Sequence, residues 1–127
     1  GLAVALRALA ADVSERSRLQ IDLEIDGHAT LPPNVEVVIY RVMQEALTNT
    51  VRHARATRVR AYLGLGPRLV VLTVEDDGRG LSPDVRPNLG WLGMQERVTA
   101  AGGTLAITGH GAPGVRLTAS IPVEAGL

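Results

Sequence analysis

The sequence of 127 residues contains no cysteine, no lysine and no phenylalanine. Without cysteine, the chain can form neither a disulfide framework nor a thiolate metal site. Without lysine, it lacks the residue that the P-loop and the eukaryotic-type protein kinase each place on nucleotide phosphates. Both of those phosphate-binding designs are therefore excluded.

Neither sign of charge is in excess, because thirteen arginines balance thirteen acidic residues. This balance gives no argument for nucleic acid or a membrane surface as a partner. No stretch approaches the roughly 20 apolar residues of a membrane-spanning helix. Hydrophobic residues make up 46% and charged residues 20%, which is typical of a folded domain. Because the chain begins inside a helical pattern without a methionine, we interpret residues 1–127 as a single domain cut from a longer protein.

Apolar periodicity predicts eight secondary-structure elements. Helical spacing covers residues 2–16, the stretch that begins after Pro32-Pro33 and runs to Ala54, and residues 90–101. Alternation of apolar and polar residues predicts strands over 19–26, 59–63, 69–74, 104–108 and 115–121. The order α-β-α-β-β-α-β-β predicts an α+β fold, with a largely antiparallel sheet and helices on one face.

The long helix carries an apolar stripe with a polar edge beside it. The stripe consists of Val35, Val38, Ile39, Val42, Met43, Ala46, Leu47, Val51 and Ala54. Glu45, Asn49 and His53 are spaced by four, so they lie about one turn apart along one edge of the helix. A carboxylate, an amide and an imidazole beside a buried face indicate a candidate site. The spacing alone leaves open an ordinary amphipathic helix whose polar edge contains these residues.

Two glycine-rich segments suggest what such a site would bind. Asp76-Asp77-Gly78-Arg79-Gly80 follows a predicted buried strand, and Gly90 and Gly93 stand at the start of the last predicted helix. Glycines expose backbone N–H groups, and a helix N-terminus favours negative charge, so these positions suit an anionic ligand. We expect a nucleotide to lie between the long helix, the Asp76 turn and the Gly90 segment.

The sequence lacks the residue patterns that several other enzyme classes require. The three histidines fall in three separate elements without an H-E-x-x-H motif, which disfavours a metal hydrolase. No G-x-S-x-G sequence is present for acyl transfer, and no pair of carboxylates is placed in a predictable cleft for glycoside hydrolysis.

The three segments resemble the nucleotide-binding boxes of the GHKL ATPases. Glu45-x-x-x-Asn49-x-x-x-His53-Ala54 resembles the N box, Asp76-x-Gly78-x-Gly80 the G1 box, and Gly90-x-x-Gly93-Met94 the second glycine box. The phrases Gln44–Asn49, Asp76–Gly80 and Leu92–Val98 resemble, more specifically, the catalytic ATP-binding domain of bacterial sensor histidine kinases of the nitrate-sensor class. This resemblance extends over essentially the whole chain.

The resemblance implies a two-layer α/β sandwich, the Bergerat fold, which binds ATP and Mg²⁺. It implies that Asp76 accepts a hydrogen bond from the adenine amino group, that Asn49 ligates Mg²⁺, and that Glu45 is the catalytic residue orienting a metal-bound water or neighbouring group. The further ATP-binding residues that it implies are Arg52, His53, Gly78, Gly80, Gly90, Leu92, Gly93 and Met94.

The resemblance also implies partners and a location. The γ-phosphate of ATP would face a histidine on a dimerisation domain of the same protein, and a response regulator would act downstream. The parent protein would be a homodimer with no nucleic-acid partner, and this domain would be cytoplasmic even where the parent is anchored in a membrane. The fragment alone would bind ATP without phosphorylating itself.

Two other readings stay open. One is a stand-alone GHKL regulator, such as an anti-sigma-factor-like serine kinase. The other is an ATPase of the DNA-repair or chaperone type, although these carry large extra domains. The phrase from Leu92 to Arg97 favours the sensor kinase.

The chain also departs from the family pattern. Asn88 stands where a glycine is usual and Trp91 where leucine is usual, and Gly114 and Val115 replace a frequent Gly-Thr pair. The predicted lid, residues 82–88, is short, and without phenylalanine the Phe-containing box of other kinase classes is missing.

Overall fold

The computed structural model describes residues 1–78, 89–109 and 114–124, without the side chains of residues 53, 54, 89 and 90. The elements are α1 (Leu2–Ser17), β1 (Gln20–Gly27), α2 (Pro33–Asn49), the π-helical turn η1 (Thr50–Ala54), β2 (Arg58–Leu65), β3 (Leu69–Asp76), α3 (Leu89–Ala100), β4 (Thr104–Thr108) and β5 (Arg116–Pro122). The predicted order of helices and strands is confirmed.

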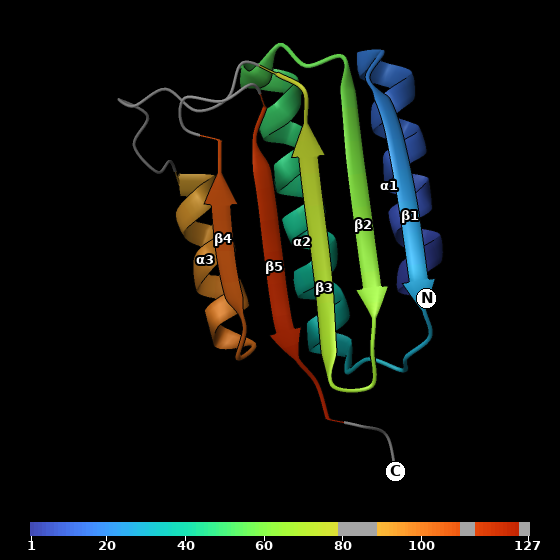
Figure 1. Ribbon diagram of the computed structural model, residues 1–127, viewed down its shortest axis with the longest axis vertical. Helices are drawn as coiled ribbons and strands as arrows, with labels where there is room; N and C mark the ends of the chain where they lie inside the picture. Colours follow the sequence, from blue (N-terminus) through green and yellow to red (C-terminus); the bar gives the residue numbers. More distant parts are fainter. Residues whose placement is uncertain (79–88, 110–113, 125–127) are drawn as a thin grey trace.

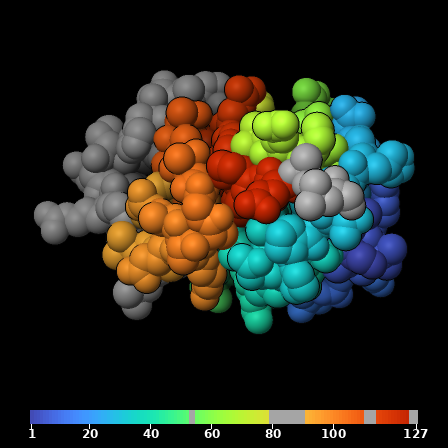
Figure 2. Space-filling model, turned by 90° about the horizontal axis from the view of Figure 1, so that it is seen from below, coloured from blue at the N-terminus to red at the C-terminus, as the bar shows by residue number. Residues whose placement is uncertain are grey.

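The five strands form one sheet in the order β1-β2-β3-β5-β4. β1 and β2 are parallel, and the other three pairs are antiparallel. The helices α1, α2 and α3 lie behind this sheet in Figure 1, and in the view from below in Figure 2 the red residues near the end of β5 lie above the teal residues at the start of α2. The predicted α+β sandwich, with a mixed and largely antiparallel sheet covered on one face, is confirmed.

The hydrophobic core lies between the two layers. Alternation along the strands directs Val59, Ala61 and Leu63 of β2, Val70, Leu72 and Val74 of β3, and Leu117, Ala119 and Ile121 of β5 towards the helices. The helices contribute Leu6, Ile39, Val42, Met43, Leu47, Met94 and Val98 to the same cluster. No helix in the described ranges has both the length and the apolarity needed to cross a bilayer.

The opposite face of the sheet is polar. Arg58 pairs with Asp22 at 2.8 Å, and Arg116 pairs with Glu75 at 2.9 Å. The hydrogen bond from Arg58 lowers the pKa of the Asp22 carboxyl. Because both pairs are substantially exposed to solvent, they contribute little to stability.

The end of the long helix differs from the prediction. The α-helix ends at Asn49 and continues as a π-helical turn, in which each turn contains about one residue more. The extra residue rotates the side chains that follow. Val51, predicted on the apolar stripe, is therefore 48% exposed, while Thr50 is buried with 6% of its surface exposed.

Candidate functional site

The predicted site residues come from elements that meet at one end of the molecule. α2 and β3 both end there, and β5 and α3 both begin there (Figure 1). The antiparallel pairing of β3 with β5 fixes this arrangement, because it places the residue before β5 beside the last residue of β3. Residues that lie 26 and 39 positions away in the sequence are thus brought together around Asp76.

Asp76, the last residue of β3, is held by backbone groups. Its carboxylate Oδ1 accepts hydrogen bonds from the backbone N–H of Gly78 at 2.8 Å and of Val115 at 3.3 Å. Its own N–H donates to the Val115 carbonyl at 3.0 Å. Only 9% of the residue is exposed. Oδ1 is thereby occupied, and Oδ2, which lies 3.4 Å from the Thr50 hydroxyl, remains the oxygen able to receive a further donor.

Glycines allow the backbone to close around this carboxylate. Gly114 has a φ of +86°, and a Cβ at that position would overlap the Asp76 carbonyl oxygen. Its N–H donates to the Gly78 carbonyl at 2.6 Å, which links the turn after β3 to the segment before β5. A side chain at Gly114 would therefore force the two segments apart. Gly80 of the predicted G1 box lies outside the described residues.

The neighbouring Asp77 fastens the turn to β2. Its Oδ1 accepts from the backbone N–H groups of Thr57 at 2.8 Å and Arg58 at 2.9 Å, and its Oδ2 accepts from the Thr57 hydroxyl at 2.7 Å. These donors, the Arg58 N–H foremost, lower the pKa of Asp77 from its ordinary value of 3.8 to about 2. Each of them favours the charged carboxylate.

Asp77→Asn should lower the thermal unfolding midpoint at neutral pH, because an amide cannot accept all three hydrogen bonds. The folded-state pKa is depressed, so the contribution of the carboxylate is fully present above about pH 4 and is lost as the pH falls towards 2. The difference between variant and wild type should therefore shrink across that range.

Unfolding followed by circular dichroism between pH 7 and pH 2 measures this difference. Asp12→Asn is the matched control, because Asp12 pairs with Arg16 on the exposed surface of α1. A constant difference for Asp77→Asn over the whole pH range would contradict the role given to its charge.

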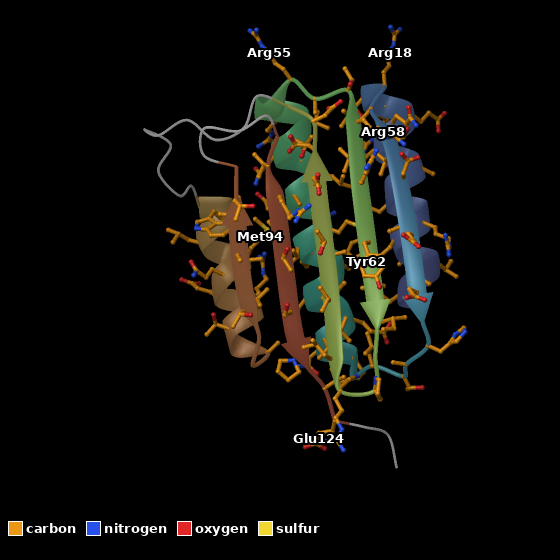
Figure 3. All side chains as sticks on the ribbon, in the orientation of Figure 1. Arg18, Arg55, Arg58, Tyr62, Met94 and Glu124 are labelled. Carbon is orange, nitrogen blue, oxygen red and sulfur yellow. The ribbon has the colours of Figure 1, made fainter. Side chains whose placement is uncertain are left out.

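The polar edge of α2 lies at the same end of the sheet. Asn49 is the last residue of the α-helix, Glu45 lies one turn earlier, and both are half-buried. Arg52 is exposed in the π-helical turn, and the side chain of His53 lies outside the described residues. Arg55 projects from this end as well (Figure 3). Because the π turn starts after Asn49, the predicted regular spacing holds from Glu45 to Asn49 and changes before His53.

The donor set is compatible with magnesium. No group of three or more His, Cys, Asp or Glu residues suitable for a metal occurs in the parts of the chain that the structure describes. Magnesium does not require such a cluster, because it is usually held by one or two protein oxygens together with water and substrate phosphates. A half-buried amide oxygen at Asn49, with the Glu45 carboxylate on the preceding turn, fits that pattern.

The last predicted box forms the first turns of α3. Gly90 lies in the first turn, Leu92 is 45% exposed, and Gly93 is half-buried. Met94 is only 1% exposed and belongs to the hydrophobic core, so its side chain holds α3 against that core. Trp91 is partly buried and packs against the same core.

Sequence reasoning missed several residues around Asp76. Thr57, Gly114 and Val115 contact the Asp76–Gly78 turn mainly through backbone groups, which leave no signature in the sequence. Thr50 did leave a signal, because it is a lone hydroxyl residue four positions after Ala46, within the apolar stripe.

Comparison with known proteins decides the family. Residues 34–125 match the sequence model of the family described as histidine kinase-, DNA gyrase B-, and HSP90-like ATPase. The chain belongs to this ATPase family. It is therefore an ATP-binding domain with the GHKL fold, as the sequence boxes predicted.

Proteins similar in sequence to this chain include sensor histidine kinases. The chain is 37% identical over 121 residues to the sensor histidine kinase YxjM of Bacillus subtilis, which covers 94% of this chain and 30% of YxjM. It is 39% identical over 126 residues to the histidine-protein kinase/phosphatase UhpB of Salmonella typhimurium, covering 95% of this chain and 24% of UhpB. The ATPase domain thus spans less than a third of the length of these relatives.

Solved structures with the same fold include a histidine kinase domain. The histidine kinase domain of the blue-light activated kinase from Erythrobacter litoralis EL346 has a TM-score of 0.77 at 26% identity, covering 95% of this chain and 60% of that one. Full-length ShkA, in complex with AMPPNP, has a TM-score of 0.79 at 20% identity, covering 96% of this chain and 30% of that one. The second similarity concerns the fold alone.

Proposed function

We propose that this ATPase domain is the catalytic domain of a two-component sensor histidine kinase, which presents the γ-phosphate of Mg²⁺-bound ATP to a histidine on a separate dimerisation domain. The observation that carries the proposal is the Asp76 turn, in which two backbone N–H groups hold one carboxylate oxygen and the Thr50 hydroxyl lies 3.4 Å from the other, which would accept from the ligand. The named sensor kinases that align with nearly the whole chain support the same function.

The adenine base of ATP would lie against the end of β3. Asp76 Oδ2 would accept a hydrogen bond from the adenine amino group, and Gly78 and Gly80 would let the backbone approach the ring. The fixed Oδ1 supports this role, because a carboxylate held by the backbone presents its second oxygen in one orientation. Binding then loses little entropy in ordering the acceptor.

The phosphates and the metal would lie between α2 and α3. Asn49 would ligate Mg²⁺ through its amide oxygen, and Glu45 would orient a metal-bound water or neighbouring group. Bound Mg²⁺ supplies neutralisation of the phosphate charge. Further ATP-binding residues in the proposal are Arg52, His53, Gly90, Leu92, Gly93 and Met94, of which Met94 is buried in the hydrophobic core. Positioning and charge neutralisation are most of what phosphoryl transfer asks of such a domain.

The partners follow from this division of labour. The phosphoacceptor histidine would belong to the dimerisation domain of a homodimeric parent protein, and a response regulator would take the phosphoryl group from it. The domain would act on the cytoplasmic side of a membrane where the parent is anchored in one. The alternative regulator, an anti-sigma-factor-like serine kinase, would instead phosphorylate a serine of a bound partner.

Labelling with γ-³²P-ATP and Mg²⁺ tests the proposal. The chain alone should incorporate no acid-labile phosphate, and adding the dimerisation domain of its parent protein should produce acid-labile label on that added domain. Acid-labile label on His28, His53 or His110 of the isolated chain would overturn the division of labour. Acid-stable label on a partner serine would favour the regulator.

A further inference from the structure

Thr50 and Asp76 form a buried polar pair in an otherwise apolar interior. They are the two buried polar or charged side chains in the described part of the chain, with 6% and 9% of their surfaces exposed. They also contact each other, because Thr50 Oγ1 lies 3.4 Å from Asp76 Oδ2. Burying polar groups costs free energy unless they are hydrogen-bonded, and here Thr50 donates to the Ala46 carbonyl while Asp76 accepts from the N–H groups of Gly78 and Val115.

The hydrogen bonds of Thr50 leave its lone pairs available. The hydroxyl has one hydrogen, and the Ala46 carbonyl at 3.0 Å is a closer acceptor than Asp76 Oδ2 at 3.4 Å. When the hydrogen is directed at Ala46, Thr50 Oγ1 can accept. Asp76 Oδ2 can accept as well, since the two backbone donors go to Oδ1.

Thr50 is the first residue of the π-helical turn. Its backbone N–H donates to both the Ala46 and Leu47 carbonyls, and the next residue, Val51, is exposed to solvent. π-helical turns within helices occur frequently at functional sites. Thr50 lies four residues after Ala46, so helical spacing places its hydroxyl on the buried face beside the carboxylate, while the π-helical turn leaves Val51 exposed.

We propose that Thr50 is a second base-recognition residue, so that Thr50 Oγ1 and Asp76 Oδ2 together accept hydrogen bonds from the exocyclic amino group of adenine. This assignment rests on the proposed function, in which Asp76 contacts the base. At a nitrogen roughly 2.9 Å from each oxygen, the directions to the two oxygens would differ by about 70°. Both hydrogen bonds would therefore depart from linearity but remain within hydrogen-bonding range. The pair suits a primary amine, which brings two hydrogens.

The test compares two ligands in two variants. Thr50→Val keeps the shape of the side chain and removes the acceptor, whereas Thr50→Ser keeps the hydroxyl. The ligands are ADP and purine riboside 5′-diphosphate, which lacks the amino group. Thr50→Val should bind ADP roughly three- to tenfold more weakly, as expected for one neutral hydrogen bond, and should bind the purine analogue as the wild type does. Thr50→Ser should retain the wild-type preference for ADP.

The ratio of the two dissociation constants from titration calorimetry is the deciding quantity, because loss of folded protein or a distorted pocket affects both ligands alike. An equal loss for both ligands, or no loss for ADP, would overturn the role of Thr50. Asp76→Asn separates this result from the proposed function. If Asp76→Asn weakens ADP binding while Thr50→Val does not, only the Thr50 inference fails; if Asp76→Asn has no effect on ADP, the base site itself is wrong.

Discussion

Replacing Asp76 with alanine is expected to weaken ADP binding by about 1–3 kcal/mol, because the buried amino group of the base loses its acceptor. The loss corresponds to roughly 5- to 150-fold in the dissociation constant. The variant also removes the acceptor for the Gly78 and Val115 N–H groups, so part of the loss would come from a loosened turn.

Asp76→Asn isolates the contribution of the hydrogen bond between Asp76 and the adenine amino group. The amide oxygen can replace Oδ1 and keep both backbone hydrogen bonds, while the amide NH₂ takes the place of Oδ2 and meets the amino group as donor against donor. We therefore expect a loss of ADP affinity with less effect on the thermal unfolding midpoint than Asp76→Ala shows. Titration calorimetry with ADP measures the affinity, and unchanged affinity in both variants would remove Asp76 from the site.

Replacing Asn49 with leucine should abolish the magnesium-dependent part of ATP binding. The proposed oxygen ligand is lost and an apolar side chain of similar size takes its place, so the metal would lose its link to the protein. The fold should survive, because Asn49 is only half-buried at the end of α2. The binding of ATP in EDTA should change much less than the binding in Mg²⁺.

Asn34→Leu is the matched control for this experiment. Asn34 is exposed in the first turn of the same helix, at the end opposite to the proposed site. Calorimetric titrations of ATP with Mg²⁺ and with EDTA should show the normal magnesium effect in Asn34→Leu and none in Asn49→Leu. A normal magnesium effect in Asn49→Leu would place the metal elsewhere.

The fold could be predicted from the sequence because its elements are strongly periodic. The alternation of Val70, Leu72 and Val74 and the helical spacing of Ile39, Met43 and Leu47 each describe one buried face, and the structure buries these faces against each other. The end of α2 could not be predicted in the same way. A π-helical turn adds a residue to the turn, and periodicity analysis assumes a constant period, so Val51 was wrongly placed on the apolar stripe.

The candidate site was predicted in part. Asp76 and Asn49 come from sequence boxes, and the structure brings the ends of their elements to one end of the sheet. The support around Asp76 depends on Val115, whose N–H and carbonyl groups reach Asp76 from 39 residues further along the chain, and on Gly114, whose N–H donates to the Gly78 carbonyl. Such contacts follow from strand register, which the side chains of these two residues do not encode.

A nucleotide site around Asp76 is tested most directly by the change in backbone amide chemical shifts as ADP and Mg²⁺ are added to the ¹⁵N-labelled chain. We expect large changes at Asn49, Thr50, Gly78 and Val115, which lie at one end of the sheet, and none at Leu65 and Gly66 in the turn at the opposite end. Changes confined to that opposite turn, or none at Gly78 and Val115 at saturating ADP, would contradict a nucleotide site built around Asp76.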